Sequence, residues 1–262
     1  MRTFCLTMLA VCLQSCASAP GSIAAQGDQE NVVVQWNARI LEFAEEEDGF
    51  LTLKGLRAAA MAHLAIVDAL DAVTTASSNR QLTDTQAYHL RVAAINSAAY
   101  EVAVNQFPNK STELSKLHSH WQRQSMGNDI GPSGQAAGRD AALAILQARR
   151  DDGWDTPSSY QFHPMGPGVY AEFNEHSGTP EGFVFGAGWA RAKGFALASP
   201  SQFRVPAPPA INSHAYTAAF DEVKEKGRFQ SYTRTPDQTH LALWWKDFVE
   251  ISHNRLARRL VL

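Results

Sequence analysis

Histidines and acids placed close together along the chain are the first residues that could do chemistry, because imidazole and carboxylate groups bind metal ions. His118 and His120 lie two positions apart, which on a helix turns their side chains about 200° away from each other. We therefore expect two surface residues there, not a shared ligand face. His63 and Asp68 lie five apart and are also poorly spaced for one ion, so His63 is expected to pack on a neighbour and hydrogen-bond a carbonyl.

Two runs of acids have the oxygen ligands that a hard cation such as Ca²⁺ prefers. Residues 45–48 read Glu-Glu-Glu-Asp, but they fall at an expected helix C-terminus, where the helix dipole disfavours negative charge. A solvated acidic turn is the better interpretation. Residues 151–155 read Asp-Asp-Gly-Trp-Asp and lack the alternation and the distal glutamate of an EF-hand loop. Calcium at this second run is the minor alternative.

Candidate nucleophiles are few. Pro132-Ser133-Gly134-Gln135 is the one suggestive run. No Gly-x-Ser-x-Gly elbow and no phosphate-binding Gly-x-x-x-x-Gly-Lys occurs. All three cysteines lie within the first 25 residues, so no thiol catalyst is predicted in the body of the chain. From these patterns we assign no catalytic, cofactor-binding or metal-binding residue.

Composition and the N-terminus indicate an exported globular protein. The chain has 262 residues, 45% of them hydrophobic, and a net charge of −3, which favours a packed core and gives no basic stripe for nucleic acid. Residues 1–25 have the positive start and short apolar run of a secretory signal. Leu13-Gln14-Ser15-Cys16 resembles a lipoprotein cleavage box that would make Cys16 a lipid anchor, and ordinary cleavage near Ala24 or Ala25 is the alternative. The expected location is periplasmic, outer-membrane-anchored or secreted.

Helical periodicity dominates the rest of the chain, residues 26–262, and predicts an all-α bundle. In the second expected helix Leu56, Ala60, Leu64 and Val67 share one face, and many alanines allow a close neighbour. Thr235, with Pro236 next and Gln238 three residues after the cap, forms a capping box. The expected helices are residues 32–46, 53–73, 83–107, 112–124, 134–150, 213–226 and a last one from 235, followed by a basic turn at 254–262.

Residues 153–210 interrupt the helices with frequent glycine, proline and aromatic residues. A structureless segment this long is uncommon in a compact domain, and so many rings would not remain in water. We expect an ordered segment that wraps over the helices.

Segments spread over nearly all of residues 26–262 resemble the N-terminal half of the vanadium-dependent haloperoxidases, a family within the type 2 phosphatidic acid phosphatase superfamily. The match is ordered along the chain, and the fifth segment is the most specific. The segments are Trp36-Asn37; residues 57–70, from Arg57 through His63 to Asp68; Gly138-Arg139 with Arg149-Arg150-Asp151-Asp152-Gly153; Gln202-Phe203-Arg204 with Tyr216; Ser231-Tyr232-Thr233-Arg234-Thr235-Pro236-Asp237-Gln238-Thr239; and residues 253–257 (His-Asn-Arg-Leu-Ala).

The resemblance implies two related helical bundles in the whole family member, with the vanadate site in the C-terminal one. There a lysine and arginines hold the oxyanion, and a Ser-Gly-His segment and a second histidine act on it. This chain contains no Arg-Pro dipeptide, and Gln135 stands where the Ser-Gly-His segment would have its histidine. No functional residue of the family therefore transfers to this sequence, and neither a vanadate cofactor nor turnover is predicted for it.

Three hypotheses follow. In the first, the chain is the exported, inactive N-terminal portion of a haloperoxidase-like protein whose catalytic half is lost, separately encoded or cut off; the position of its last residues in the family pattern favours truncation. In the second, it is a stand-alone non-catalytic helical binding module, whose exposed apolar face is its interface. In the third, it is a divergent phosphatase. Partners left open are the catalytic half, a lipid anchor at Cys16 and a second copy of the chain.

Overall fold

The computed structural model describes residues 31–49, 53–78, 80–125, 130–157 and 186–246, together with the single residues 160, 161, 163 and 169. The expected signal segment at residues 1–25, Cys16 and the expected basic turn at 254–262 lie outside the described residues. So does part of the aromatic segment at 153–210.

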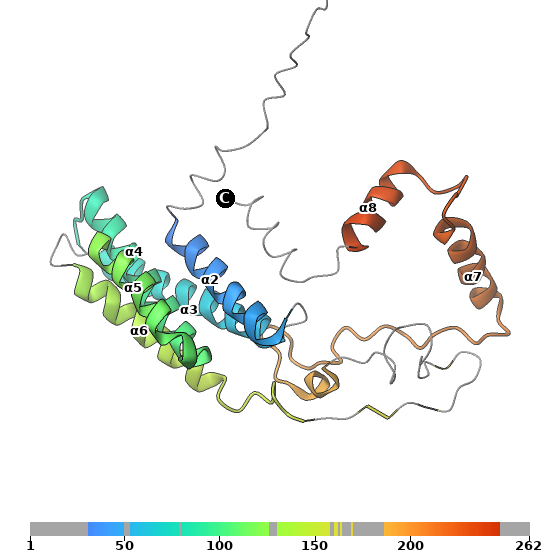
Figure 1. Ribbon diagram of the computed structural model, residues 1–262, viewed down its shortest axis with the longest axis horizontal. Helices are drawn as coiled ribbons and strands as arrows, with labels where there is room; N and C mark the ends of the chain where they lie inside the picture. The colour runs from blue at the N-terminus through green and yellow to red at the C-terminus, as the bar shows by residue number, and fades with distance from the viewer. Residues whose placement is uncertain are drawn as a thin grey trace, which may run out of the picture.

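All regular structure in the described ranges is helical, which confirms the predicted all-α class. The seven α-helices and two short 3-10 segments are α2 (Val32–Asp48), α3 (Leu53–Ser77), α4 (Asp84–Gln106), η1 (Pro108–Lys110), α5 (Ser111–Ser125), α6 (Gly131–Ala148), η2 (Ala187–Arg191), α7 (His214–Gly227) and α8 (Pro236–Lys246). Helices α2 to α6 pack side by side as one bundle, and α7 and α8 lie away from it (Figure 1). None of the described helices is long and apolar enough to cross a lipid bilayer.

Polar residues at the helix starts explain where several helices begin. Asn31 accepts the amide protons of Val33 and Val34 at the start of α2. The capping box at α8 is confirmed: the Thr235 amide donates to the Gln238 side chain at 3.0 Å, and the Gln238 amide donates to the Thr235 hydroxyl at 3.1 Å. Helix α6 starts at Gly131, three residues earlier than predicted, with proline in its first turn.

Helix α4 is the centre of the bundle, because α2, α3, α5 and α6 all pack on it. Its closest neighbour is α6, and two glycines make that approach possible. A Cβ added at Gly134 would lie 2.5 Å from the Leu90 carbonyl oxygen, and one at Gly138 would lie 2.3 Å from the Ala94 carbonyl oxygen. Glycine is therefore required at both positions for the two backbones to lie this close. Gly134 of the Pro-Ser-Gly-Gln run thus has a packing role inside a helix.

The buried face of α3 differs from the predicted one. Leu64 and Val67, expected in the core, are 39% and 52% exposed. The core face instead combines alanines, among them Ala58, Ala62 and Ala65, each no more than 2% exposed, with the larger Met61 and Ile66. Close packing on α4 and α6 favours the alanine-rich side of the helix, because a short side chain lets the neighbouring backbone come nearer. Leu64 and Val67 are left on the outer side.

Buried polar side chains of the core are paired with one another. The Trp36 indole donates to the side-chain oxygen of Asn96 at 3.0 Å, and the Asn96 amide donates to the backbone oxygen of His118 at 3.0 Å. Next to it, His63 Nε2 donates to the side-chain oxygen of Asn37 at 2.9 Å. The Trp36-Asn37 pair thereby links α2 to both α4 and α3. Satisfied buried pairs of this kind fix the register of neighbouring helices.

The expected wrapping segment is only partly supported. Trp154 and Phe195 lie against arginines of the bundle, as described below. Phe203, however, is 76% exposed, so the expectation that its ring is covered is wrong. The residues beside it, 201–210, are themselves exposed and do not cover the ring.

Candidate functional site

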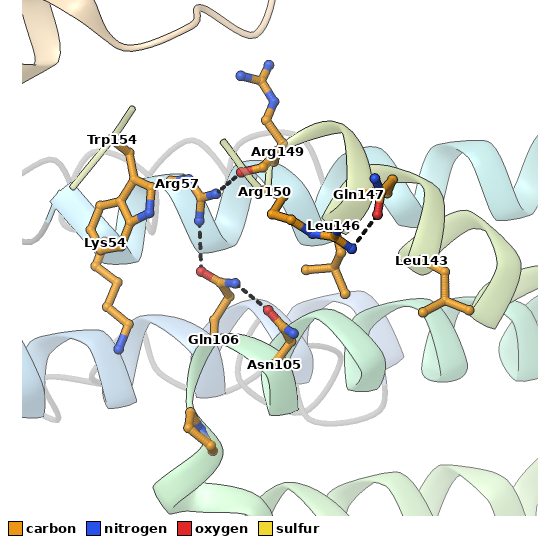
Figure 2. A pocket seen from close by; sticks show the side chains of 11 residues that line it. Lys54, Arg57, Asn105, Gln106, Leu143, Leu146, Gln147, Arg149, Arg150 and Trp154 are labelled. Atoms are coloured by element: carbon orange, nitrogen blue, oxygen red, sulfur yellow. Dashed lines mark hydrogen bonds between the residues drawn. The ribbon is translucent and has the colours of Figure 1, made fainter. Parts of the chain in front are cut away.

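A cleft of about 810 Å³ opens at the end of the bundle where α3 begins and where α4 and α6 end. Polar residues form much of its wall, and four of them are cationic. Figure 2 shows Lys54 and Arg150 on opposite sides of Arg57, with Gln106 below it. The lining residues are Lys54, Arg57, Asn105, Gln106, Pro108, Leu143, Leu146, Gln147, Arg149, Arg150 and Trp154.

Arg57 is the centre of this cleft and is almost fully buried. Its Nε donates to Asp152 at 2.9 Å, its Nη1 to the side-chain oxygen of Gln106 at 2.9 Å and its Nη2 to the backbone oxygen of Arg149 at 2.7 Å. The guanidinium also lies over the Trp154 ring, 5.1 Å from the centroid. The C-terminal ends of α4 and α6 meet here, and their exposed carbonyls favour a cation.

Arg149 and Asp152 complete a buried ion cluster with Arg57. Arg149 donates to the backbone oxygens of Lys193 and Gly194 at 2.7 and 2.9 Å, and its guanidinium lies 3.8 Å from the centroid of the Phe195 ring. Its Nη1 is 3.8 Å from the Asp152 carboxylate. The side chains of the two arginines are 6% exposed and that of the aspartate 2%. Two buried cations therefore share one buried anion.

The outer wall of the cleft carries the other two cations. Lys54 is on the first turn of α3 and pairs with Glu47. Arg150 is exposed and donates to the side-chain oxygen of Gln147, and it forms no ion pair within the described part of the chain. Leu143 and Leu146 of α6 form an apolar strip on the Arg150 side of the cleft, and Trp154 lies at the Lys54 end (Figure 2). Pro108 also lines the cleft.

Anion binding is the chemistry that these groups support most directly. Among the described residues the cleft is lined by three arginines, one lysine and side-chain amides, without a carboxylate or histidine. Guanidinium and ammonium groups do hold phosphate and carboxylate groups through charge-assisted hydrogen bonds. A second cavity of about 330 Å³ shares Arg57 and Trp154 with the cleft and is otherwise lined largely by aromatic and small residues of the 189–200 segment.

Imidazole occurs in a different cavity of about 350 Å³, beside α5 and the start of α6. His118 is half-buried there and stacks on Tyr100 with 4.2 Å between ring centroids, so the prediction that it is a surface residue is wrong. Its Nδ1 is buried without a hydrogen-bond partner. Burial lowers the pKa of His118, since the charged form would lose its hydration. One arginine, Arg139, lines this cavity.

The remaining predicted positions have structural partners. His63 bonds a side-chain carbonyl, as expected, and burial lowers its pKa. His120 is exposed. In the acidic run at residues 45–48, Glu46 and Glu47 pair with lysines. In the second run, Asp152 is bound to Arg57 and is not free to ligate a cation. The described residues hold no group of three or more histidine, cysteine, aspartate or glutamate residues suited to a metal ion.

The cleft was not foreseen from the sequence. Lys54 and Arg57 lie three positions apart on a helix, and Arg149 and Arg150 follow the end of another. Both are sequence signals for a basic surface, but nothing local indicates that residues 95 positions apart, Arg57 and Asp152, pair with each other.

Comparison with known proteins found no matching family model, no matching curated protein and no matching solved structure. The described ranges form an all-α bundle with a basic cleft at one end, and α7 and α8 lie outside the bundle. The haloperoxidase family remains a prediction from the motifs.

Proposed function

We propose that this chain is the non-catalytic helical portion of a vanadium-haloperoxidase-like protein. We further propose that α7 and α8 bind a second helical body, the bundle that carries the oxyanion site. The single observation that carries the proposal is the exposure of the elbow between these helices. Phe229 and Tyr232 are 93% and 91% exposed, although the elbow around them is well ordered by hydrogen bonds.

Arg234 ties the elbow together. Its Nη1 donates to the backbone oxygens of Lys226 and Arg228 at 2.6 and 2.9 Å, its Nη2 to that of Phe229 at 3.2 Å, and its Nε to the Thr239 hydroxyl at 3.0 Å. The end of α7 is thereby fixed to the start of α8. An elbow that is rigid yet has no core of its own is suited to present side chains to a partner.

Apolar side chains continue from the elbow along both helices. No residue of α7 is buried, and this arm (residues 214–246) exposes more than half of several large side chains. They are Phe220, Val223, Phe229, Tyr232, Leu241, Leu243 and Trp245. Clustered exposed apolar residues mark an interaction surface. A helical second body fits this chemistry, because apolar side chains of both helices can pack against the apolar face of another helix.

The separation of the cluster of four cations from His118 supports a non-catalytic role. A trianion such as vanadate needs several fixed cations, and a nearby imidazole must move protons to bound peroxide. In the described residues the cluster of cations lines one cavity and His118 lines another.

Two measurements on the purified chain test the proposal. With vanadate, peroxide and bromide supplied, we expect no halide oxidation, and turnover would overturn the non-catalytic role. In solution we expect a monomer that binds an apolar fluorescent dye, with less dye bound by the double variant Phe229→Ser and Tyr232→Ser. The matched control is Tyr88→Ser, at a half-exposed ring on α4. A stable dimer that binds no dye would mean that the arm pairs with a second copy instead.

A further inference from the structure

The basic cleft has an excess positive charge. Arg57, Arg149 and Asp152 are buried together and sum to one excess positive charge. Backbone carbonyls solvate the two guanidinium groups but carry no net charge. A buried cation without a counter-ion is costly, and the open side of the cluster faces the cleft, which no carboxylate lines.

The two cations on the outer wall add to this field. Arg150 has only a neutral amide as its partner, so its charge is available to a ligand. Lys54 is neutralised by Glu47, and a more highly charged anion in the cleft would compete for it. Lys54 and Arg150 lie on either side of Arg57 (Figure 2), so both add positive charge to the cleft around it.

The apolar strip indicates that the ligand is more than a bare ion. A cleft of about 810 Å³ is far larger than one phosphate, and it falls in the range of small-molecule sites. Leu143 is 49% exposed and lies near Leu146 (Figure 2). Such a surface gains free energy by covering an apolar group.

We propose that this cleft binds an organic phosphate monoester, with its phosphate on Arg150, near the charges of Arg57 and Lys54, and its apolar part against Leu143 and Leu146. The Arg150 guanidinium favours phosphate, because its fork can donate parallel hydrogen bonds to two oxygens of one group.

Calorimetric titration of the purified chain with phenyl phosphate tests this proposal, with inorganic phosphate and phenol as separate arms. We expect saturable binding of phenyl phosphate below about 1 mM, weaker binding of inorganic phosphate and none of phenol. Equal affinity for phenyl phosphate and inorganic phosphate would contradict the proposed apolar contact. Lack of any phosphate binding would overturn it.

Matched variants locate the site. Arg150→Gln and Lys54→Gln should each weaken phenyl phosphate binding about fivefold, the size expected for one partly solvated charge. Leu143→Ser should weaken phenyl phosphate but leave inorganic phosphate unchanged. Arg123→Gln, an exposed arginine of α5, is the control and should bind as the parent does. If the cleft variants lost no more affinity for phenyl phosphate than Arg123→Gln does, this location of the site would be refuted.

The cleft belongs to the bundle and the proposed partner surface to the arm, so the two proposals fail separately. Dye binding and the absence of halide oxidation test the arm. Phosphate titration tests the cleft and does not depend on whether a second helical body exists.

Discussion

Replacing Gly138 by alanine tests the closest contact in the bundle. The added Cβ would lie 2.3 Å from the Ala94 carbonyl oxygen, 2.8 Å from the Ala98 amide nitrogen and 2.8 Å from the Ser97 Cβ. Two of these are backbone atoms of α4, which cannot rotate away as a side-chain tip could. The variant can form only if α4 and α6 move apart.

Two opposing effects set the size of the change. Alanine favours a helix over glycine by about 1 kcal/mol, so in open space the substitution would stabilise. Overpacking costs about 1–3 kcal/mol, and the upper end applies because the obstacle is backbone and the seam between α4 and α6 is the most extensive in the bundle. The net expectation is a loss of about 2 kcal/mol, obtained as roughly 3 minus roughly 1.

Urea unfolding followed by tryptophan fluorescence measures this loss as a lower midpoint at unchanged slope. Gly227→Ala is the matched control: it changes the last residue of α7, where the nearest atom to an added Cβ is 3.8 Å away. That control should be neutral or slightly more stable. If the Gly138 variant were as stable as the parent protein, the inferred close approach of the two helices would be refuted.

Three further perturbations address the buried polar groups. Asp152→Asn should destabilise the chain by about 3 kcal/mol, because it leaves two buried arginines without an anion, whereas the exposed neighbour in Asp151→Asn should change stability little in the same urea assay. Trp36→Phe should cost about 1–3 kcal/mol, since it leaves a buried amide oxygen unpaired; a loss below a few tenths would contradict that pairing. Burial lowers the pKa values of His63 and His118 from 6.5, so the unfolded chain takes up their protons first on acidification. Their contribution to stability is complete above about pH 6.5 and should decline below it. A urea midpoint that increases as the pH is lowered from about 7 to about 5.5 would refute this.

Local signals of the sequence predicted the helices well. The capping box of Thr235 and Gln238 predicted the start of α8, because it acts through hydrogen bonds within one turn. Helical periodicity gave the all-α class for the same reason. These features depend on neighbours a few residues away.

Features that depend on distant residues were missed. The predicted face of α3 counted leucine and valine as core, yet the close approach of other helices selected the alanine side. Gly134 and Gly138 have a spacing of four that indicates a close helix crossing, but the first was considered mainly as part of a catalytic-looking run. The cleft needed Arg57, Gln106 and Asp152 together, and no local pattern brings them into one place.

The ion cluster of Arg57 also bears on how this chain folds. Its bonds join residues 95 and 92 positions apart, and Arg149 reaches a further 44 positions to Lys193. Neighbouring helices can dock early, whereas contacts this distant in sequence must wait for large loops to close. We expect the cluster to form after the rate-limiting step of folding, so that its loss speeds unfolding and leaves the refolding rate nearly unchanged. The cluster would then set the lifetime of the native state by slowing its unfolding.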